Sequence, residues 1–317
     1  MKKVIRFNFY FFFMFAILFF ASASSQSKYE KLVENTQEDF MAPEWSPDGS
    51  MIAFTSAKYN GIWIINIQNR SIKQITDEDA AGFLFKWSGD SNSILTRVAK
   101  YDGMKRYNAV KLFNVRSGES SLLTGYRTMM PGLPSFTPDY NKVYMYGRNN
   151  LEIFDSGIGA IPYKKSAVSS NIIYLRNDKI AVEVLTSHKV KTFEPVKDKR
   201  VLNLQASPDG SRVAFEIYGG DMYVMNTDGK GLTDLGKGYR PKWSPDNQHI
   251  VYMTTKDDGY RILSSDIYTI TIDGTEKTNL TKTIDRVEMN PDWSPDGKKI
   301  AFDVPGEGSI YIMKVQQ

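Results

Sequence analysis

Short apolar runs, each preceded by a tight polar turn, recur along the chain. The clearest copy is Asp292–Phe302, where Trp293 precedes a Ser-Pro-Asp-Gly turn and an Ile-Ala-Phe run follows it. Proline presets φ at the first central turn position, aspartate bonds to the backbone two residues on, and glycine takes a positive φ at little cost. The apolar run is typical of a buried strand. The pattern therefore predicts a strand, a turn and a second strand.

Five other stretches repeat this pattern: Ala42–Phe54, Phe85–Leu95, Pro134–Tyr146, Gln205–Phe215 and Pro241–Tyr252. Four of the five tryptophans hold the same position in their copies, namely Trp45, Trp87, Trp243 and Trp293. We expect this large apolar ring to pack against a neighbouring unit. Because the same serine and aspartate occur in several copies, we interpret them as turn-forming residues and not as a catalytic pair.

A third apolar strand follows each copy, as in Gly61–Ile67 and Ser309–Val315. Beyond it, most units have a turn and a short strand near a Leu-Thr or Ile-Thr pair: Ile75-Thr76, Leu123-Thr124, Leu232-Thr233 and Leu280-Thr281. One unit is thus four short strands in 37 to 50 residues, which is the period of a propeller blade. The sequence predicts an all-β chain that folds as a β-propeller of four-stranded blades.

The two ends of the chain are expected to complete one blade together. After Trp293 the sequence has only two further strands, so the last unit lacks its fourth. Tyr29–Thr36 has the pattern of that missing strand, and Leu32 precedes Trp45 by the spacing that the other units show. A ring closed by this N-terminal strand would leave no sheet with an open edge.

The number of blades depends on one long interval. From Phe136 to Ala206 the step is 70 residues, whereas the other steps run from 37 to 50. Within it, Ile172–Val184 resembles a degraded copy in which Asn177-Asp178 forms the turn. Seven blades are therefore favoured, with six as the alternative.

Residues 1–23 have the organisation of a secretory signal peptide. A basic start is followed by an apolar region of fourteen residues and then by Ala21-x-Ala23, a typical cleavage signal. We expect the propeller domain to occupy residues 24–317, to be periplasmic or secreted, and to have no membrane span after cleavage. Without residues 1–23 the chain has 37 basic and 36 acidic residues, a balance that does not point to nucleic acid. It has no cysteine and hence no disulfide.

The Trp-Ser-Pro-Asp-Gly turn, the Ile-Ala-Phe strand and third strands of the Ile-Tyr-x-Met type resemble the TolB-like propeller repeat. The resemblance covers nearly all of residues 29–317. The family includes the periplasmic TolB protein of the Tol–Pal envelope system, non-catalytic propellers of prolyl-oligopeptidase-type and tricorn-like proteases, and some oligogalacturonate lyases. The resemblance therefore implies a fold without choosing one activity.

Departures from each relative narrow the expected function. TolB carries a separate N-terminal α/β domain, for which there is no room between Ala23 and Trp45. The protease relatives carry a Gly-x-Ser-x-Gly nucleophile turn, a string that does not occur here. The lyase relatives hold a divalent metal through several histidines, whereas this chain has only His188 and His249. We interpret His249 as a strand residue and His188 as an exposed turn residue, and we predict no catalytic, metal-binding or cofactor-binding residue.

A binding surface is the remaining expectation. In a propeller, loops from second to third strands and from fourth strands to the next blade share one face. These loops are predicted to contain the candidate partner face: Tyr59, Tyr101, Arg106, Tyr126, Arg127, Tyr239, Arg240, Tyr260 and Arg261. Tyrosine and arginine contribute most at protein interfaces, although a chain with 18 tyrosines must also place some in ordinary loops.

The expected function is that of an exported, monomeric, non-catalytic interaction module, whose partner is an envelope protein or is associated with peptidoglycan. The alternative is a glycan-binding or diverged oligogalacturonate-lyase-like propeller.

Overall fold

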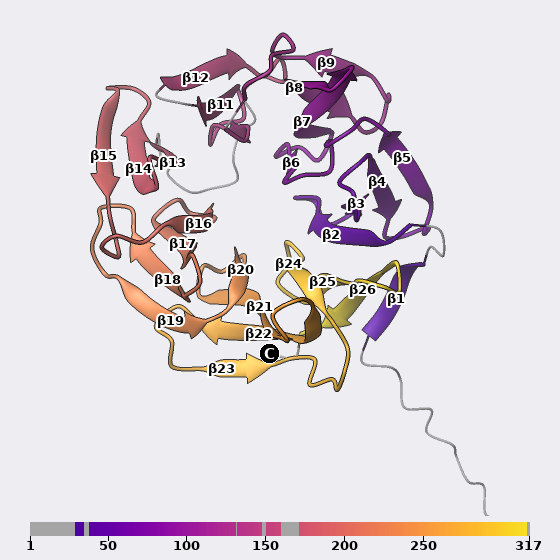
Figure 1. Cartoon of the computed structure of the whole chain (residues 1–317), viewed down its shortest axis with the longest axis vertical. Coiled ribbons are helices and arrows are strands. Elements are labelled where there is room, and N and C mark those ends of the chain that lie inside the picture. Colours follow the sequence, from indigo (N-terminus) through magenta and orange to yellow (C-terminus); the bar gives the residue numbers. More distant parts are fainter. Residues whose placement is uncertain (1–28, 35–37, 131, 148–149, 160–170, 316–317) are drawn as a thin grey trace, which may run out of the picture.

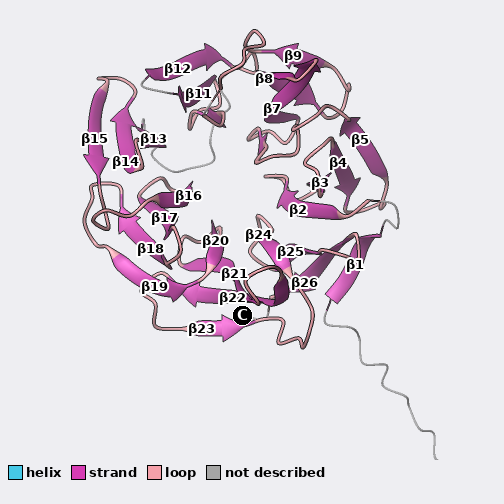
Figure 2. Ribbon diagram, viewed as in Figure 1, coloured by secondary structure: helices cyan, strands magenta, loops and turns pink. Residues whose placement is uncertain are grey.

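The computed structural model describes residues 29–34, 38–130, 132–147, 150–159 and 171–315, and they form strands and loops (Figure 2). The predicted signal peptide, residues 1–23, lies outside the described residues. The strands make seven sheets around one axis, which confirms the β-propeller and the seven blades (Figure 1). Of the residues that the structure describes, none belongs to a helix that could cross a membrane.

Five blades have four antiparallel strands each, which follow one another from the axis outward. They are blade 1, β2 (Phe40–Trp45), β3 (Met51–Ser56), β4 (Ile62–Asn66) and β5 (Ile72–Thr76); blade 2, β6 (Lys86–Trp87), β7 (Ser93–Asp102), β8 (Lys105–Asn114) and β9 (Ser120–Leu122); blade 5, β16 (Val201–Ala206), β17 (Arg212–Ile217), β18 (Asp221–Asn226) and β19 (Thr233–Lys237); blade 6, β20 (Tyr239–Trp243), β21 (His249–Asp257), β22 (Ile262–Thr271) and β23 (Lys277–Asn279); and blade 7, β24 (Met289–Trp293), β25 (Lys299–Val304), β26 (Ser309–Lys314) and β1 (Tyr29–Glu34).

The other two blades have three strands each within the described residues. They are blade 3, β10 (Ser135–Phe136), β11 (Lys142–Gly147) and β12 (Asn150–Asp155), and blade 4, β13 (Asn171–Arg176), β14 (Lys179–Val184) and β15 (Lys189–Phe193). Asn177 and Asp178, with φ of 52° and 61°, form the predicted turn between β13 and β14, and positive φ at both positions is the geometry of a type I′ hairpin. After β15, residues 194–200 form no strand, because a proline and charged residues replace the apolar alternation.

The serine and aspartate of the repeat do form the turn. Ser294 Oγ donates to Asp296 Oδ1 at 2.6 Å and accepts from the backbone N–H of Lys299 at 2.9 Å. The bond from Ser294 helps to hold the pKa of Asp296 below its ordinary value. The same hydroxyl–carboxylate bond begins at Ser46, Ser88, Thr137, Ser207 and Ser244. The interpretation of this pair as a folding device is confirmed.

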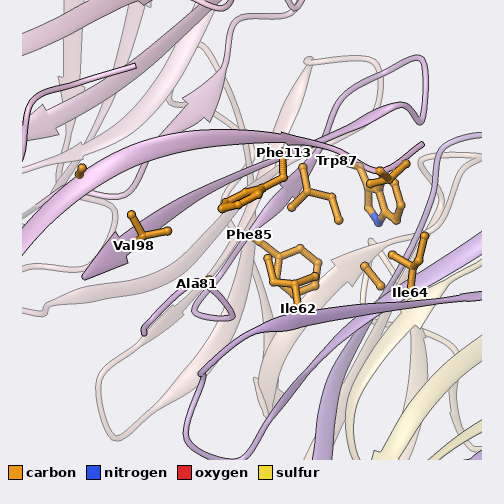
Figure 3. Packing of buried hydrophobic residues seen from close by; sticks show 11 residues of the cluster. Ile62, Ile64, Ala81, Phe85, Trp87, Val98 and Phe113 are labelled. Carbon is orange, nitrogen blue, oxygen red and sulfur yellow. The ribbon is translucent and has the colours of Figure 1, made fainter. Parts of the chain in front are cut away.

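The motif tryptophans pack against the preceding blade. Trp87 lies in a core cluster with Ile62 and Ile64 of blade 1 (Figure 3), and its Nε1 donates to the carbonyl oxygen of Glu44 at 3.1 Å. Trp243 packs in the same way against blade 5, and its Nε1 donates to the carbonyl oxygen of Gln205 at 3.2 Å. The hydrophobic core is therefore divided into clusters between blades, and each of these two clusters joins two consecutive repeats.

The predicted closing strand is confirmed over Tyr29–Glu34, and residues 35–36 of the prediction lie outside the described residues. β1 pairs antiparallel with β26, from Tyr29 opposite Met313 to Glu34 opposite Ser309. Val33 is 3% exposed and packs in a cluster that contains residues of blades 1 and 7. The hydroxyl of Tyr29 also donates to the carbonyl oxygen of Thr281 in blade 6 at 2.7 Å. The first described strand thus links the last blade to both of its neighbours.

Candidate functional site

The antiparallel blades give the ring two different ends. The motif turns and the connections from third to fourth strands lie at one end, which we call the motif-turn end. The connections from second to third strands and the crossings to the next blade lie at the opposite end, which we call the hairpin end. All nine residues of the predicted partner face belong to the hairpin end.

Two hairpins are longer than the rest. The strands β7, β8, β21 and β22 have nine or ten residues, whereas every other described strand has at most six. At about 3.3 Å per residue, the extra length carries the tips roughly 10 Å beyond their neighbours. Met104 and Tyr260 stand at the tips with relative exposures of 103% and 99%. Blades 2 and 6 therefore present two apolar projections at the hairpin end.

Exposed apolar side chains collect at this end. Among the described residues, ten of the fourteen exposed large hydrophobic side chains lie there: Leu84, Tyr101, Met104, Met129, Tyr218, Tyr239, Tyr260, Ile262, Leu263 and Ile284. The other four, Ile72, Leu122, Val190 and Leu232, lie in or next to outer strands. Clustered exposed apolar surface marks interaction sites more often than isolated apolar residues do.

Four residues of the predicted face lie in strands, although loops were expected. Tyr101 and Arg106 are paired across the β7–β8 hairpin, because the ladder continues as far as Asp102 and Lys105. Tyr239 and Arg240 open β20. Loop length was overestimated at these positions, since nothing in the local sequence shows how far a ladder continues past the blade core.

The nine residues form groups on different blades. Blade 2 carries Tyr101, Arg106, Tyr126 and Arg127, and blade 6 carries Tyr239, Arg240, Tyr260 and Arg261. Lys100 Nζ lies 4.2 Å from the centre of the Tyr126 ring, and Arg127 pairs with Glu152 at 2.9 Å. Tyr59, on blade 1, packs edge-on against Phe83 with ring centres 5.1 Å apart. The structure brings Tyr59 and Arg240 to one cavity at the axis and leaves the other seven outside it.

That cavity, of about 110 Å³, is built on a repeated distortion of the innermost strands. Three residues before the motif position, the backbone takes a positive φ in five blades: at Ala42, Leu84, Asn203, Arg240 and Asn290. In four of them this is a β-bulge, because the pairing register shifts there. The left-handed backbone conformation destabilises a non-glycine residue by about 1–3 kcal/mol. Its occurrence in five blades therefore requires contacts that offset this strain.

Buried carboxylates supply that contact in two blades. Asp303, fully buried on β25, accepts from the backbone N–H of Ala42 at 2.9 Å and from Asn290 Nδ2 at 2.7 Å. Glu216 on β17 likewise accepts from the N–H of Arg240 and from Asn203 Nδ2. Burial raises the pKa of Asp303 to about 7 and raises that of Glu216. Each carboxylate binds its own blade to the next.

Sequence reasoning missed these two acids. Their signal is an acidic residue directly after the apolar run of the second strand, in Ile-Ala-Phe-Asp-Val and Val-Ala-Phe-Glu-Ile. A charged residue at such a buried position needs hydrogen-bond partners.

A cluster of four charged side chains also lies at the axis. The residue just before the motif tryptophan is Glu44 on β2, Lys86 on β6, Lys242 on β20 and Asp292 on β24. Lys242 Nζ lies 2.6 Å from Glu44 Oε1 and 3.8 Å from Asp292 Oδ1. Burial opposes ionisation of Glu44, but attraction to Lys242 and Lys86 outweighs it and lowers the pKa of Glu44. For Asp292, burial prevails and raises the pKa to about 7.

The two histidines lie apart. His188, in a turn of blade 4, has Nδ1 3.4 Å from Glu183 Oε1, and His249, in blade 6, has Nδ1 3.4 Å from Asp246 Oδ2. Within the described ranges no group of three or more His, Cys, Asp or Glu side chains is arranged to hold a metal ion.

Comparison of the sequence with known proteins finds partial similarity. No protein-family model matches the chain. An uncharacterized protein of Agrobacterium fabrum is 31% identical over 117 residues, which are 35% of this chain and 38% of that protein. The match thus spans well under half of the relative's length.

Three solved structures resemble the whole ring. A protein of Agrobacterium tumefaciens assigned as TolB has a TM-score of 0.53 at 17% identity, over 89% of this chain and 92% of that one. An oligogalacturonate lyase in complex with manganese has a TM-score of 0.53 at 11% identity, over 91% and 93%. The propeller domain of Cps50 (Swd1) from Myceliophteria thermophila has a TM-score of 0.60 at 9% identity, over 91% and 100%. With seven blades, six of which carry the serine- or threonine-to-aspartate turn, the chain has the fold of a TolB-like β-propeller.

Proposed function

We propose that the chain is an exported, non-catalytic propeller that binds a protein of the cell envelope at its hairpin end. The observation that carries the proposal is the collection of exposed apolar side chains at that end, with Met104 and Tyr260 at the tips of two projecting hairpins. Methionine and tyrosine are enriched at protein interfaces. Exposed apolar groups at one end supply the hydrophobic area that a partner would bury.

The arrangement of the hairpins favours a partner that enters between them. Blades 1 and 7 lie between blades 6 and 2 along the ring (Figure 1). The crossings beside the two long hairpins carry Leu84 and Ile284, which are themselves exposed. The two projections could therefore hold a segment from both sides while its apolar residues contact these crossings.

The buried charges suit a structural role. Asp303 and Glu216 accept hydrogen bonds from backbone and amide groups of two blades, and Lys242 is bound by two carboxylates. Hydrogen bonds between buried polar groups of neighbouring blades rigidify a structure. The envelope location rests on the signal-type pattern of residues 1–23 and on the fold shared with TolB.

The alternative, a glycan-binding or diverged lyase-like propeller, is favoured by the fold shared with an oligogalacturonate lyase. That likeness, at 11% identity, extends to the fold alone. The two functions differ in what the protein binds: an acidic oligosaccharide in one case and a protein in the other.

Capture from an envelope extract tests the proposal. Immobilised protein should retain a protein partner, and Met104→Ser with Tyr260→Ser should lose it. A matched control, Ile72→Ser with Leu122→Ser, removes exposed apolar groups of the outer strands and should retain the partner. Retention by the hairpin variant would contradict the proposed site. Cleavage of oligogalacturonate with added Mn²⁺ would contradict the non-catalytic assignment.

A further inference from the structure

A larger cavity, of about 380 Å³, lies among the inner strands of blades 2 to 5. Lys86 from β6, Ser135 from β10, Ile173 from β13 and Gln205 from β16 line it, and the motif-turn residue Asp209 closes one side. Its volume falls in the lower part of the roughly 300–1,000 Å³ typical of small-molecule sites. None of the nine partner-face residues lines it, so a ligand site in this cavity is independent of the proposed function.

Lys86 is the charged group in this cavity that lacks a direct partner. Lys242 occupies the equivalent position on β20 and binds Glu44 and Asp292. No hydrogen bond, and no ion pair within 4 Å, joins Lys86 Nζ to any of the residues described. Burial lowers the pKa of Lys86, and the Glu44 charge opposes this only in part. Lys86 is half-buried and unpaired, so an anion that enters the cavity would be stabilised beside it.

The charged side chains around Lys86 are of both signs. Arg240, Lys242 and Lys86 approach the axis from two blades, against the carboxyl groups of Glu44 and Asp292. Asp209, which also lines the cavity, is hydrogen-bonded within its own motif turn by Ser207 and Ser211. Lys86 is therefore the charged group of the cavity that an anion can pair with.

The side chains that line the cavity indicate which ligand would fit it. Trp87, Phe136, Tyr140 and Tyr144 supply aromatic surface, and Ser135 and Gln205 supply polar groups. One unpaired ammonium group matches a single negative charge, and the aromatic side chains favour contact with a planar ring. Inorganic phosphate would leave those walls without a partner.

We propose that this cavity binds a small carboxylate with an aromatic ring, whose carboxylate pairs with the ammonium group of Lys86 while the ring lies against the aromatic wall. The Ser135 hydroxyl, which also lines the cavity, bonds to the Tyr144 hydroxyl and helps to hold that ring in the wall. Pairing with the ligand would favour the charged form of Lys86, so affinity should fall as the pH rises through the pKa of that lysine.

Titration of the purified protein with benzoate, phenylacetate and 3-phenylpropionate tests this site, followed by calorimetry and by the indole N–H signal of Trp87. At least one of these acids should bind at least tenfold more tightly than its neutral amide and should shift the Trp87 signal. Inorganic phosphate should neither bind comparably nor shift that signal.

Substitutions of lysine test whether Lys86 is the cation that pairs with the ligand carboxylate. Lys86→Met should weaken binding of the acid at least tenfold, Lys86→Arg should restore most of it, and Lys298→Met, a control at an exposed lysine of the motif-turn end, should leave it unchanged. Thermal melting checks that each variant is folded. Equal binding of acid and amide, no binding of any of the three acids, phosphate binding as tight as that of the acids, or unchanged binding by folded Lys86→Met would each overturn the proposal.

Discussion

Asp303 Oδ1 accepts a hydrogen bond from the backbone N–H of Ala42 at 2.9 Å, although 261 residues separate them in the chain. The bond joins blade 7 to blade 1, where the ring closes. It also satisfies the N–H of a left-handed residue in the innermost strand. Blades 5 and 6 are joined by the same arrangement, through Glu216 and Arg240. The same hydrogen-bonding arrangement thus joins the last blade to the first and joins blade 5 to blade 6.

Removing this carboxylate should weaken the ring. Asp303→Ala leaves the Ala42 N–H and the Asn290 amide without their acceptor, and each buried unsatisfied group costs about 1–3 kcal/mol. We expect a loss of roughly 2–5 kcal/mol in the free energy of unfolding, measured by urea denaturation. Asp303→Asn keeps one acceptor oxygen and should lose less. Equal losses in the two variants would argue against the hydrogen bonds as the cause.

The free energy of unfolding should depend on pH because of Asp303. The pKa of Asp303 is about 7 in the folded chain against an ordinary value of 3.8, so the folded state holds its proton more tightly than the unfolded state does. This contribution is fully present below pH 3.8 and is lost as the pH rises to about 7. It amounts to about 4 kcal/mol at most, since one pKa unit corresponds to 1.36 kcal/mol.

Asp303→Asn should remove that dependence. The stability of the native sequence relative to Asp303→Asn should therefore decrease between pH 4 and pH 7, as measured by urea denaturation at each pH. Motif aspartates such as Asp296 have a lowered pKa and act in the opposite sense, and they are common to both proteins. A difference that stays constant with pH would show that Asp303 is charged throughout.

The closing strand should contribute strongly to stability. Deleting Tyr29–Glu34 exposes the edge of β26 and uncovers the cluster around Val33. The loss should be several kcal/mol, from about 25 cal/mol per Å² of apolar area together with the ladder hydrogen bonds. Val33→Ala should cost about 1–2 kcal/mol, whereas Lys31→Ala, at an exposed position, should cost under about 0.5. An unchanged melting temperature after the deletion would contradict the closure.

The motif serine should affect folding alone. Ser294→Ala removes the donor to Asp296 and the acceptor for Lys299, and a cost of about 1–2 kcal/mol is expected in urea denaturation. Ser120→Ala, at an exposed site on β9, is the control and should be nearly neutral. Partner capture should be unaltered in both variants. Loss of capture by folded Ser294→Ala would mean that the turn also takes part in binding.

The hairpin end should tolerate substitution and still be needed for binding. Tyr101→Ala with Tyr260→Ala should leave the melting temperature unchanged, because both rings are exposed. If both act as anchors, each costs about 1–3 kcal/mol, and affinity for the captured partner should fall at least tenfold in calorimetry. Tyr218→Ala, exposed at the same end on blade 5, is the control away from the long hairpins. Equal effects of the control and the double variant would remove the assignment to these hairpins.

The fold could be predicted from the sequence because its signals are local. The turn chemistry of Ser294, Asp296 and Gly297 and the apolar runs beside it operate over a few residues, and the repeat multiplies them. The seventh blade is encoded locally as well, because Asn177-Asp178 can form a two-residue turn. The closing strand is implied by the pattern of the repeat, since a closed ring leaves no sheet with an open edge.

Which charged side chains meet at the axis was decided by the tertiary structure alone. Lys242 and Glu44 are 198 residues apart, and no local pattern marks their pairing, because the distance between their side chains depends on how far each blade turns around the ring. The pKa of about 7 for Asp303 likewise depends on burial and on partners from two blades. Lys86 and Lys242 precede their tryptophans in the same way, yet of these two only Lys242 lies within ion-pair distance of two carboxylates across the axis. Sequence thus determined which strands form and in what order, while ring closure decided which charges meet.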